Sequence, residues 1–135
     1  MTAVSAGYLA DTSVFIAAEQ RRPLGDPPPG DARISVATLT ELLVGVHRAR
    51  DEQLKMLRNT TLSLARGFLA IPYDEPVAER LATLLSAARE SKRRAGAMDA
   101  IVAATALAHN LAVWTQDDDF EVLAELAPEL RVYRG

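Results

Sequence analysis

Two stretches at opposite ends of the chain share one layout, in which a short apolar run leads directly into acidic residues. The first run, residues 8–10, precedes Asp11 and is followed by an apolar segment over 14–18. The second run, residues 111–115, leads into Gln116 and then the three acids of 117–119. Each run predicts a short buried strand that ends at a carboxylate. Ligands of an open α/β sheet bind outside the carboxyl ends of its strands, so both strands would direct acids into one crevice.

The rest of the sequence alternates short apolar runs with amphipathic segments, interrupted by a proline-rich loop over 21–32. Strands are predicted at residues 8–10, 33–36, 69–71, 111–115 and 131–133, and helices at 11–20, 37–50, 51–66, 76–94, 100–110 and 120–126. We expect Leu57, Leu64 and Leu85 to face the core, and the helix over 100–110, apolar nearly all round, to be buried. This alternation predicts an α/β fold whose parallel sheet has helices on both faces.

Length and composition restrict the class of protein. A chain of 135 residues suits a single domain over 1–135, and a hydrophobic fraction of 49% is sufficient for a folded core. No apolar run approaches the roughly 18 residues of a membrane helix, and residues 1–7 lack the pattern of a secretory signal. The absence of cysteine excludes disulfides, thiolate metal sites and cysteine nucleophiles. We therefore expect a cytoplasmic protein without a membrane partner.

Several common catalytic motifs are missing from the sequence. It contains neither a glycine-rich phosphate loop nor the glycine–serine elbow of a serine hydrolase. The two histidines, His47 and His109, fall on predicted helices far along the chain from Asp11, so we expect them to be ordinary helix residues. The acidic residues are therefore the main candidates for chemistry.

Four acids stand out, and each also has a purely structural interpretation. Asp11 and Asp99 are placed to cap the helices that follow them. Thr38 and Glu41 match the spacing of a capping box, in which Glu41 would reach back to the start of its helix. Asp117 and its two acidic neighbours would form a solvated turn that caps the last helix.

Taken together, the same four acids favour a metal site. Asp11 and Asp117 follow strand ends, and Glu41 lies one turn into the helix after the second strand. Asp99 opens the most apolar helix, where an unpaired carboxylate would be costly. Converging carboxylates repel one another unless a cation joins them, and Mg²⁺ or Mn²⁺ prefers oxygen ligands. The sequence therefore predicts a divalent metal site.

Residues next to these acids would support such a site. Ser13 and Thr115 carry hydroxyls that would orient the predicted ligands. Small side chains follow Asp99 on its helix and would let that helix pack close beneath the crevice. These small residues are Ala100, Ala103 and Ala106.

Four motifs make the sequence resemble a PIN domain, and within that family the VapC-type toxins of toxin–antitoxin pairs. They are LADTSVFI at 9–16, TELLVG at 40–45, DAIVAA at 99–104 and TQDDDF at 115–120, in the family's order and spacing over nearly the whole chain. The resemblance implies a three-layer α/β/α sandwich with a central parallel sheet. It also implies that the chain is a Mg²⁺-dependent endoribonuclease that cleaves tRNA or rRNA.

The resemblance assigns roles to individual residues and suggests partners. The metal ligands that it implies are Asp11, Glu41, Asp99 and Asp117, and in some members an acid two places further on, here Asp119, also contributes. Family members are usually homodimers, and a VapB-type antitoxin silences them by occupying the cleft.

Basic residues would hold an RNA substrate. Only Lys55 and Lys92 of the 15 basic residues are lysines, and the arginines suit phosphate, although a genome-wide compositional bias would give the same count. The basic segment over 89–94, just before Asp99, is a candidate RNA contact. Cations at a helix C-terminus that complement the helix dipole are the alternative interpretation.

Two other classes of function stay open at this point. A receiver domain of a response regulator also has acids at strand tips, but it needs a lysine at a late strand end, and neither lysine lies near one. A binding module without catalysis would use the same acids only to recognise a partner.

Overall fold

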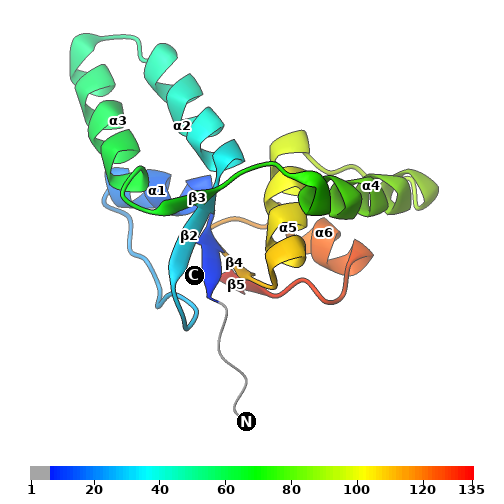
Figure 1. Cartoon of the computed structure of the whole chain (residues 1–135). Helices are drawn as coiled ribbons and strands as arrows, with labels where there is room; N and C mark the ends of the chain where they lie inside the picture. The colour runs from blue at the N-terminus through cyan, green and yellow to red at the C-terminus, as the bar shows by residue number, and fades with distance from the viewer. Residues whose placement is uncertain (1–6) are drawn as a thin grey trace.

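The computed structural model describes residues 7–135 and has a five-stranded parallel sheet at its centre (Figure 1). The strands are β1 (Tyr8–Ala10), β2 (Ala32–Ser35), β3 (Leu69–Ile71), β4 (Ala112–Thr115) and β5 (Val132–Arg134). They lie side by side in the order β3-β2-β1-β4-β5, and each neighbouring pair is parallel. Residues 1–6, which belong to the segment where no secretory signal is expected, lie outside the described residues.

Helices cover both faces of this sheet. They are α1 (Thr12–Glu19), α2 (Val36–His47), α3 (Glu52–Ala65), α4 (Glu75–Glu90), α5 (Ala97–His109) and α6 (Glu121–Leu126). One buried cluster joins the sheet mainly to α1, α2 and α3, and the other joins it mainly to α4, α5 and α6. The predicted three-layer α/β/α sandwich is thus confirmed. No helix within residues 7–135 has the length and apolarity to cross a membrane.

The central strand β1 contributes to both clusters. Leu9 packs into the cluster around α5, whereas Tyr8 and Ala10 pack into the cluster around α1, α2 and α3. This alternation follows from the two-residue period of a strand. On the second face, the rings of Tyr8 and Trp114 meet edge to face with their centroids 5.8 Å apart. Both faces of β1 are therefore buried, which fixes the position of the acid that follows the strand.

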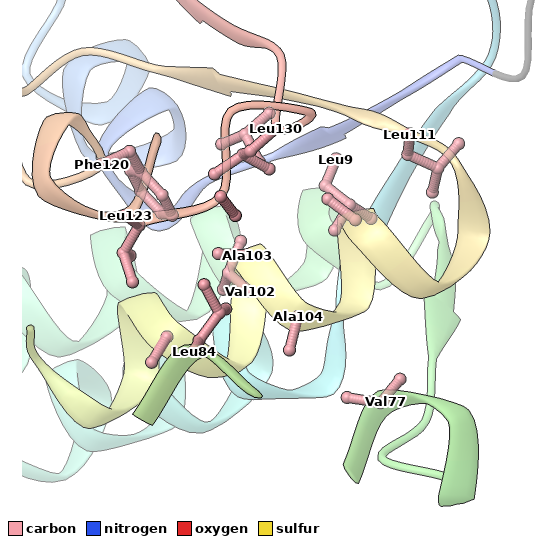
Figure 2. Packing of buried hydrophobic residues seen from close by; sticks show 14 of the residues in the cluster. Leu9, Val77, Leu84, Val102, Ala103, Ala104, Leu111, Phe120, Leu123 and Leu130 are labelled. Carbon is pink, nitrogen blue, oxygen red and sulfur yellow. The ribbon is translucent and has the colours of Figure 1, made fainter. Parts of the chain in front are cut away.

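Helix α5 lies in the centre of one layer, as its composition predicts. Residues from Val102 to Ala106 on this helix are fully or almost fully buried, as is Ala100. Figure 2 shows Ala103 among Leu9, Leu123 and their neighbours. Because the alanine side chains are small, α5 can lie close to the sheet and to α4. Its N-terminal turn, which carries Asp99, is held in place by this packing.

Three leucines expected in the core are exposed instead. Leu57 and Leu64 of α3 are 45% and 64% exposed, and Leu85 of α4 is 47% exposed. In Figure 1, α2 and α3 rise away from the sheet as a pair, and α4 extends outward on the other side. A helix placed in this way buries one narrow stripe, which in α3 is Thr61, Leu62 and Ala65. Leucines outside the stripe face solvent even though their spacing is amphipathic.

Candidate metal centre

Asp11 occupies the tip of the central strand and is almost completely buried, with 3% of its surface exposed. Its backbone N–H donates to the Trp114 carbonyl at 2.9 Å, which ties it to the neighbouring strand β4. Its Oδ2 accepts hydrogen bonds from Ser13 Oγ at 2.7 Å and from Thr115 Oγ1 at 3.1 Å. The Ser13 amide also donates to Oδ2 at 3.3 Å, so the expected N-cap of α1 is confirmed as well.

The hydroxyls of Ser13 and Thr115 link the two strand tips. Thr115 Oγ1 lies 3.2 Å from Asp117 Oδ1 as well as 3.1 Å from Asp11 Oδ2, so one hydroxyl proton serves two carboxylates. Ser13 Oγ accepts from the Gln116 amide at 2.9 Å. Both hydroxyls therefore lie where the sequence predicts residues that orient the acids.

Glu41 does not reach back to the start of its helix, and the predicted capping box is wrong. Helix α2 begins one residue earlier than expected, and Ser35 is its N-cap, accepting from the Ala37 amide at 3.0 Å. Thr38 therefore lies inside the helix. Glu41 Oε1 instead accepts from Thr12 Oγ1 at 2.7 Å. This contact holds Glu41 beside the residue that follows Asp11.

Asp99 is not the cap of α5 either. The helix begins at Ala97, and its N-cap is Gly96, which has no side chain to accept a hydrogen bond from the first turn. Asp99 thus lies in the first turn, where a carboxylate is favoured by the helix dipole. A Cβ built at Gly96 would lie 3.3 Å from Asp99 Oδ2, so the glycine leaves room for this carboxylate.

The acidic turn after β4 closes on itself and does not cap the last helix. Asp117 Oδ1 accepts from the Asp119 amide at 3.2 Å. The N-cap of α6 is Phe120, and it makes no side-chain capping bond, so the predicted capping role is wrong. Asp117 is partly buried, whereas Asp118 and Asp119 are exposed. The first acid of the turn is therefore the one turned toward Thr115.

The four acids from separate elements, with Asp119, share one electrostatic field. Burial first, and then the negative charges of Asp11, Asp119, Glu41 and Asp117, together raise the pKa of Asp99 to about 7. An aspartate with the ordinary pKa of about 4 would be fully ionised at pH 7. The raised pKa of Asp99 therefore reflects both its burial and the negative charge of the acids around it.

The pKa values of Asp11 and Glu41 are raised as well. Burial also raises the pKa of Asp11, against the hydrogen bonds from Ser13 and Thr115, which lower it. Glu41 has a raised pKa because of burial first, and then because of the charges of Asp11, Asp117 and Asp119, while the Thr12 hydroxyl opposes this shift.

The donor set fits a hard divalent cation. Every candidate ligand is a carboxylate, and the described residues of this centre include no thiol or imidazole that would favour a softer metal. Within residues 7–135, no three acidic or histidine side chains stand at distances that would already hold one ion. Carboxylates at close range repel one another, and a bound cation would offset that repulsion.

The histidines lie at helix ends, as expected for ordinary helix residues. His47 is the last residue of α2, and His109 is the last of α5, where its Nε2 lies 3.9 Å from Asp74 Oδ2. The sequence prediction missed two other contacts near the acids. The first is the hydrogen bond from Thr12 to Glu41, which the position of the Thr12 hydroxyl next to Asp11 could have indicated. The second is the ion pair between Arg93 and Glu125, 2.7 Å long, which no local sequence pattern indicates.

Comparison with known families decides the class of protein. The model of the PIN domain family matches residues 8–126, a range that contains all four acids. This chain belongs to the PIN domain family.

Relatives of this PIN domain carry a consistent description. It is 40% identical to Ribonuclease VapC4 of Mycobacterium tuberculosis (strain ATCC 25618 / H37Rv) over 119 residues, which is 87% of this chain and 92% of the relative. It is 38% identical to Ribonuclease VapC5 of the same strain over 91% of this chain and 92% of that relative. Within the PIN family, the chain therefore belongs with the VapC-type ribonucleases.

A solved structure supports the same assignment. The crystal structure of a VapBC-5 member of the VapBC toxin–antitoxin family from Mycobacterium tuberculosis superposes with a TM-score of 0.83 at 34% identity, covering 96% of this chain and 99% of that one. The resemblance inferred from four motifs is confirmed, and so is the α/β fold. A receiver domain, the first alternative, is wrong, because the family match spans most of the chain.

Proposed function

We propose that this PIN domain is a Mg²⁺-dependent endoribonuclease that acts as the toxin of a toxin–antitoxin pair and hydrolyses phosphodiester bonds of tRNA or rRNA. The proposed ligands are Asp11, Glu41, Asp99 and Asp117, with Asp119 as an auxiliary acid, and Mn²⁺ can substitute for Mg²⁺. The observation that carries this proposal is the buried Asp11 carboxylate, joined to Asp117 through one hydroxyl of Thr115.

The chain's own residues would orient the site. Ser13 and Thr115 fix Asp11 Oδ2, and Thr12 fixes Glu41 Oε1, so two ligands are held before any ion binds. The Asp99 carboxyl, with a pKa of about 7, is partly protonated at neutral pH and would release its proton when positive charge enters. When bound, Mg²⁺ supplies Lewis-acid chemistry, since it neutralises charge on a phosphodiester and acidifies water.

The proposed partners are RNA, a VapB-type antitoxin and a second copy of this chain. A cavity of about 230 Å³ is lined by Glu41 together with Ile16, Leu42, Gly45 and Arg58, among others. A protein segment bound there would lie against Glu41 and obstruct access to the acid cluster formed by Asp11, Glu41, Asp99 and Asp117. The similar structure contains a toxin and its antitoxin together, which supports the same partner for this chain.

Cleavage assays with purified protein test this function. Wild-type protein should cleave a tRNA or rRNA fraction with Mg²⁺ or Mn²⁺, and EDTA should abolish cleavage. Asp11→Asn and Asp99→Asn should each lose activity, while Asp26→Asn, in the exposed proline-rich loop, should cleave like wild type. Cleavage that survives both EDTA and Asp11→Asn would refute the assignment. Tight binding of a partner without any cleavage would favour the non-catalytic binding module.

A further inference from the structure

A depression of about 320 Å³ opens directly beside the acid cluster. Asp99 and Asp119 line one part of it, and Arg93 and Arg94 line another, with residues of α6 completing the wall. It is separate from the cavity on the Glu41 side. If the cleaved phosphate of an RNA strand lies at the acids, a neighbouring phosphate of the same strand would lie over this depression. Cations that line the depression would then contribute to RNA binding.

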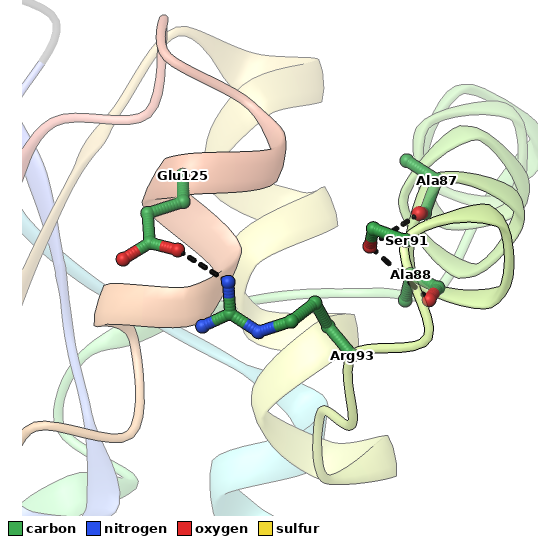
Figure 3. A network of polar contacts seen from close by, with 5 residues as sticks. All are labelled: Ala87, Ala88, Ser91, Arg93 and Glu125. Atoms are coloured by element: carbon green, nitrogen blue, oxygen red, sulfur yellow. Dashed lines mark hydrogen bonds and ion pairs between the residues drawn. The ribbon is translucent and has the colours of Figure 1, made fainter.

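The chain turns sharply at the end of α4, and this turn decides which cations reach the depression. Lys92 has a φ of 56°, in the left-handed region, and the Arg93 amide donates back to the Ala88 carbonyl at 2.9 Å. Ser91 Oγ donates to the Ala87 carbonyl at 2.9 Å in the same turn (Figure 3). The next residues therefore leave the helix axis and run toward α5 and α6, while Arg89 stays on α4.

The two arginines in the depression differ in their contacts. Arg93 Nη1 donates to Glu125 Oε2 at 2.7 Å, as Figure 3 shows, so its charge is compensated by α6. Arg94 is exposed and makes no hydrogen bond or ion pair with any residue in the described range 7–135. Of the two arginines that line the depression with Asp99, Arg94 is therefore the one whose guanidinium stays available to an anion.

We propose that Arg94 binds a backbone phosphate of the RNA next to the one that is cleaved, and that Glu125 withholds Arg93 from the same role. This inference rests on the proposed ribonuclease function and assigns a substrate contact within it. Arginine suits the task because its planar fork donates two hydrogen bonds to a phosphate. The basic segment is thereby divided, with Arg94 binding RNA and Arg89 and Lys92 outside the depression.

An RNA-binding experiment tests whether Arg94 is the phosphate contact of this segment. Binding of a short single-stranded RNA is measured by fluorescence anisotropy at increasing NaCl, with Ca²⁺ in place of Mg²⁺. A protein that holds one phosphate fewer has a slope of log affinity against log salt that is shallower by about 0.7 to 1. Arg94→Gln should show this shallower slope and bind about three-fold more weakly at low salt. Arg94→Lys should keep the slope, because it keeps the charge. Arg89→Gln, the matched control on the same segment, should behave as wild type.

Glu125→Gln provides the opposite test. Releasing Arg93 should raise the salt slope by up to about 1 and strengthen RNA binding. The inference is overturned if Arg94→Gln and Arg89→Gln change the slope equally, or if neither changes it, while wild-type protein cleaves RNA. Wild-type protein that neither binds nor cleaves RNA with Mg²⁺ would instead refute the proposed function. Unfolding curves of each variant, expected to match wild type, verify that these exposed substitutions leave the fold intact.

Discussion

Removing the charge of Asp99 should stabilise the metal-free protein at neutral and alkaline pH. Burial and four neighbouring acids raise the pKa of this carboxyl from 3.8 to about 7. The folded protein therefore binds this proton more tightly than the unfolded chain does. The stability that this group contributes is complete below about pH 4 and is lost as the pH rises through about 7.

The size of the effect follows from the same pKa. If the whole difference between 3.8 and about 7 acted on folding, ionisation would cost about 4 kcal/mol. Asp99 is partly exposed, and solvent screens its repulsion from the other acids. We therefore expect Asp99→Asn to be more stable than wild type by about 1–2 kcal/mol at about pH 8, and by close to nothing at about pH 4.

Urea unfolding in EDTA measures this difference, with the fluorescence of Trp114, the single and mostly buried tryptophan, as the signal. Asp26→Asn serves as a control for loss of an exposed carboxylate remote from the site. Saturating Mg²⁺ at about pH 8 should stabilise wild type more than Asp99→Asn, because a ligand stabilises the state that binds it. If Asp99→Asn and wild type keep a constant stability difference from about pH 4 to 8, the carboxylates do not share one field and the reasoning fails.

Three further predictions test the surroundings of the site and the core. Thr115→Val removes the hydroxyl that serves two of the acids, and should weaken Mg²⁺ binding in calorimetric titrations by about 10–100-fold, while Thr115→Ser should retain most of it. Leu84→Ala should destabilise the fold by about 2–5 kcal/mol in urea, because Leu84 is 2% exposed, whereas Leu57→Ala should change stability by less than about 0.5 kcal/mol. Gly7→Ala should cost about 1–3 kcal/mol in the same measurement, since Gly7 has a φ of 100° and an added Cβ would collide with the Asp31 carbonyl.

The sequence predicts the elements of this fold well because the spacing of apolar residues and the residues that end helices and strands are local properties. Strand β3 lies where it is expected, and α1 and α3 differ from the expected ranges by one residue at each end. The boundary between β2 and α2 is shifted by one residue because Ser35, and not a later residue, accepts the first helix amide. That choice depends on where the strand stops pairing with β3, which no local pattern contains.

The exposed leucines show a second limit of sequence reasoning. Leu57 and Leu64 have the spacing of a buried face, yet the α3 stripe that meets α1 and α2 is centred on Leu62. Periodicity identifies an amphipathic helix, but the width of the buried stripe depends on how many neighbours surround the helix. A helix at the edge of a layer has few neighbours, and the sequence does not say which helix takes that place.

The structural interpretation failed for three of the four acids, and the exception, Asp11, shows why this bears on the site. Asp11 both caps a helix and belongs to the acid cluster, so the two interpretations were compatible there. Glu41 and Asp99 cap nothing, and neither carboxylate bonds to the start of its own helix. Their positions are therefore not required by local structure, and both are partly buried at a cost in desolvation.

The strand order accounts for the meeting of acids that are more than a hundred residues apart. The chain runs outward from β1 through β2 to β3, then returns to the other side of β1 to form β4 and β5. Open α/β sheets bind their ligands at such a reversal, outside the carboxyl ends of the strands, which are here β1 and β4. Asp11 and Asp117 follow those two strands, and Thr115 bridges them because β1 and β4 are paired in register. A sequence can place an acid at a strand end, but only this order makes the two ends neighbours. A change that broke the pairing of β1 with β4 would therefore separate these two carboxylates without altering either of them.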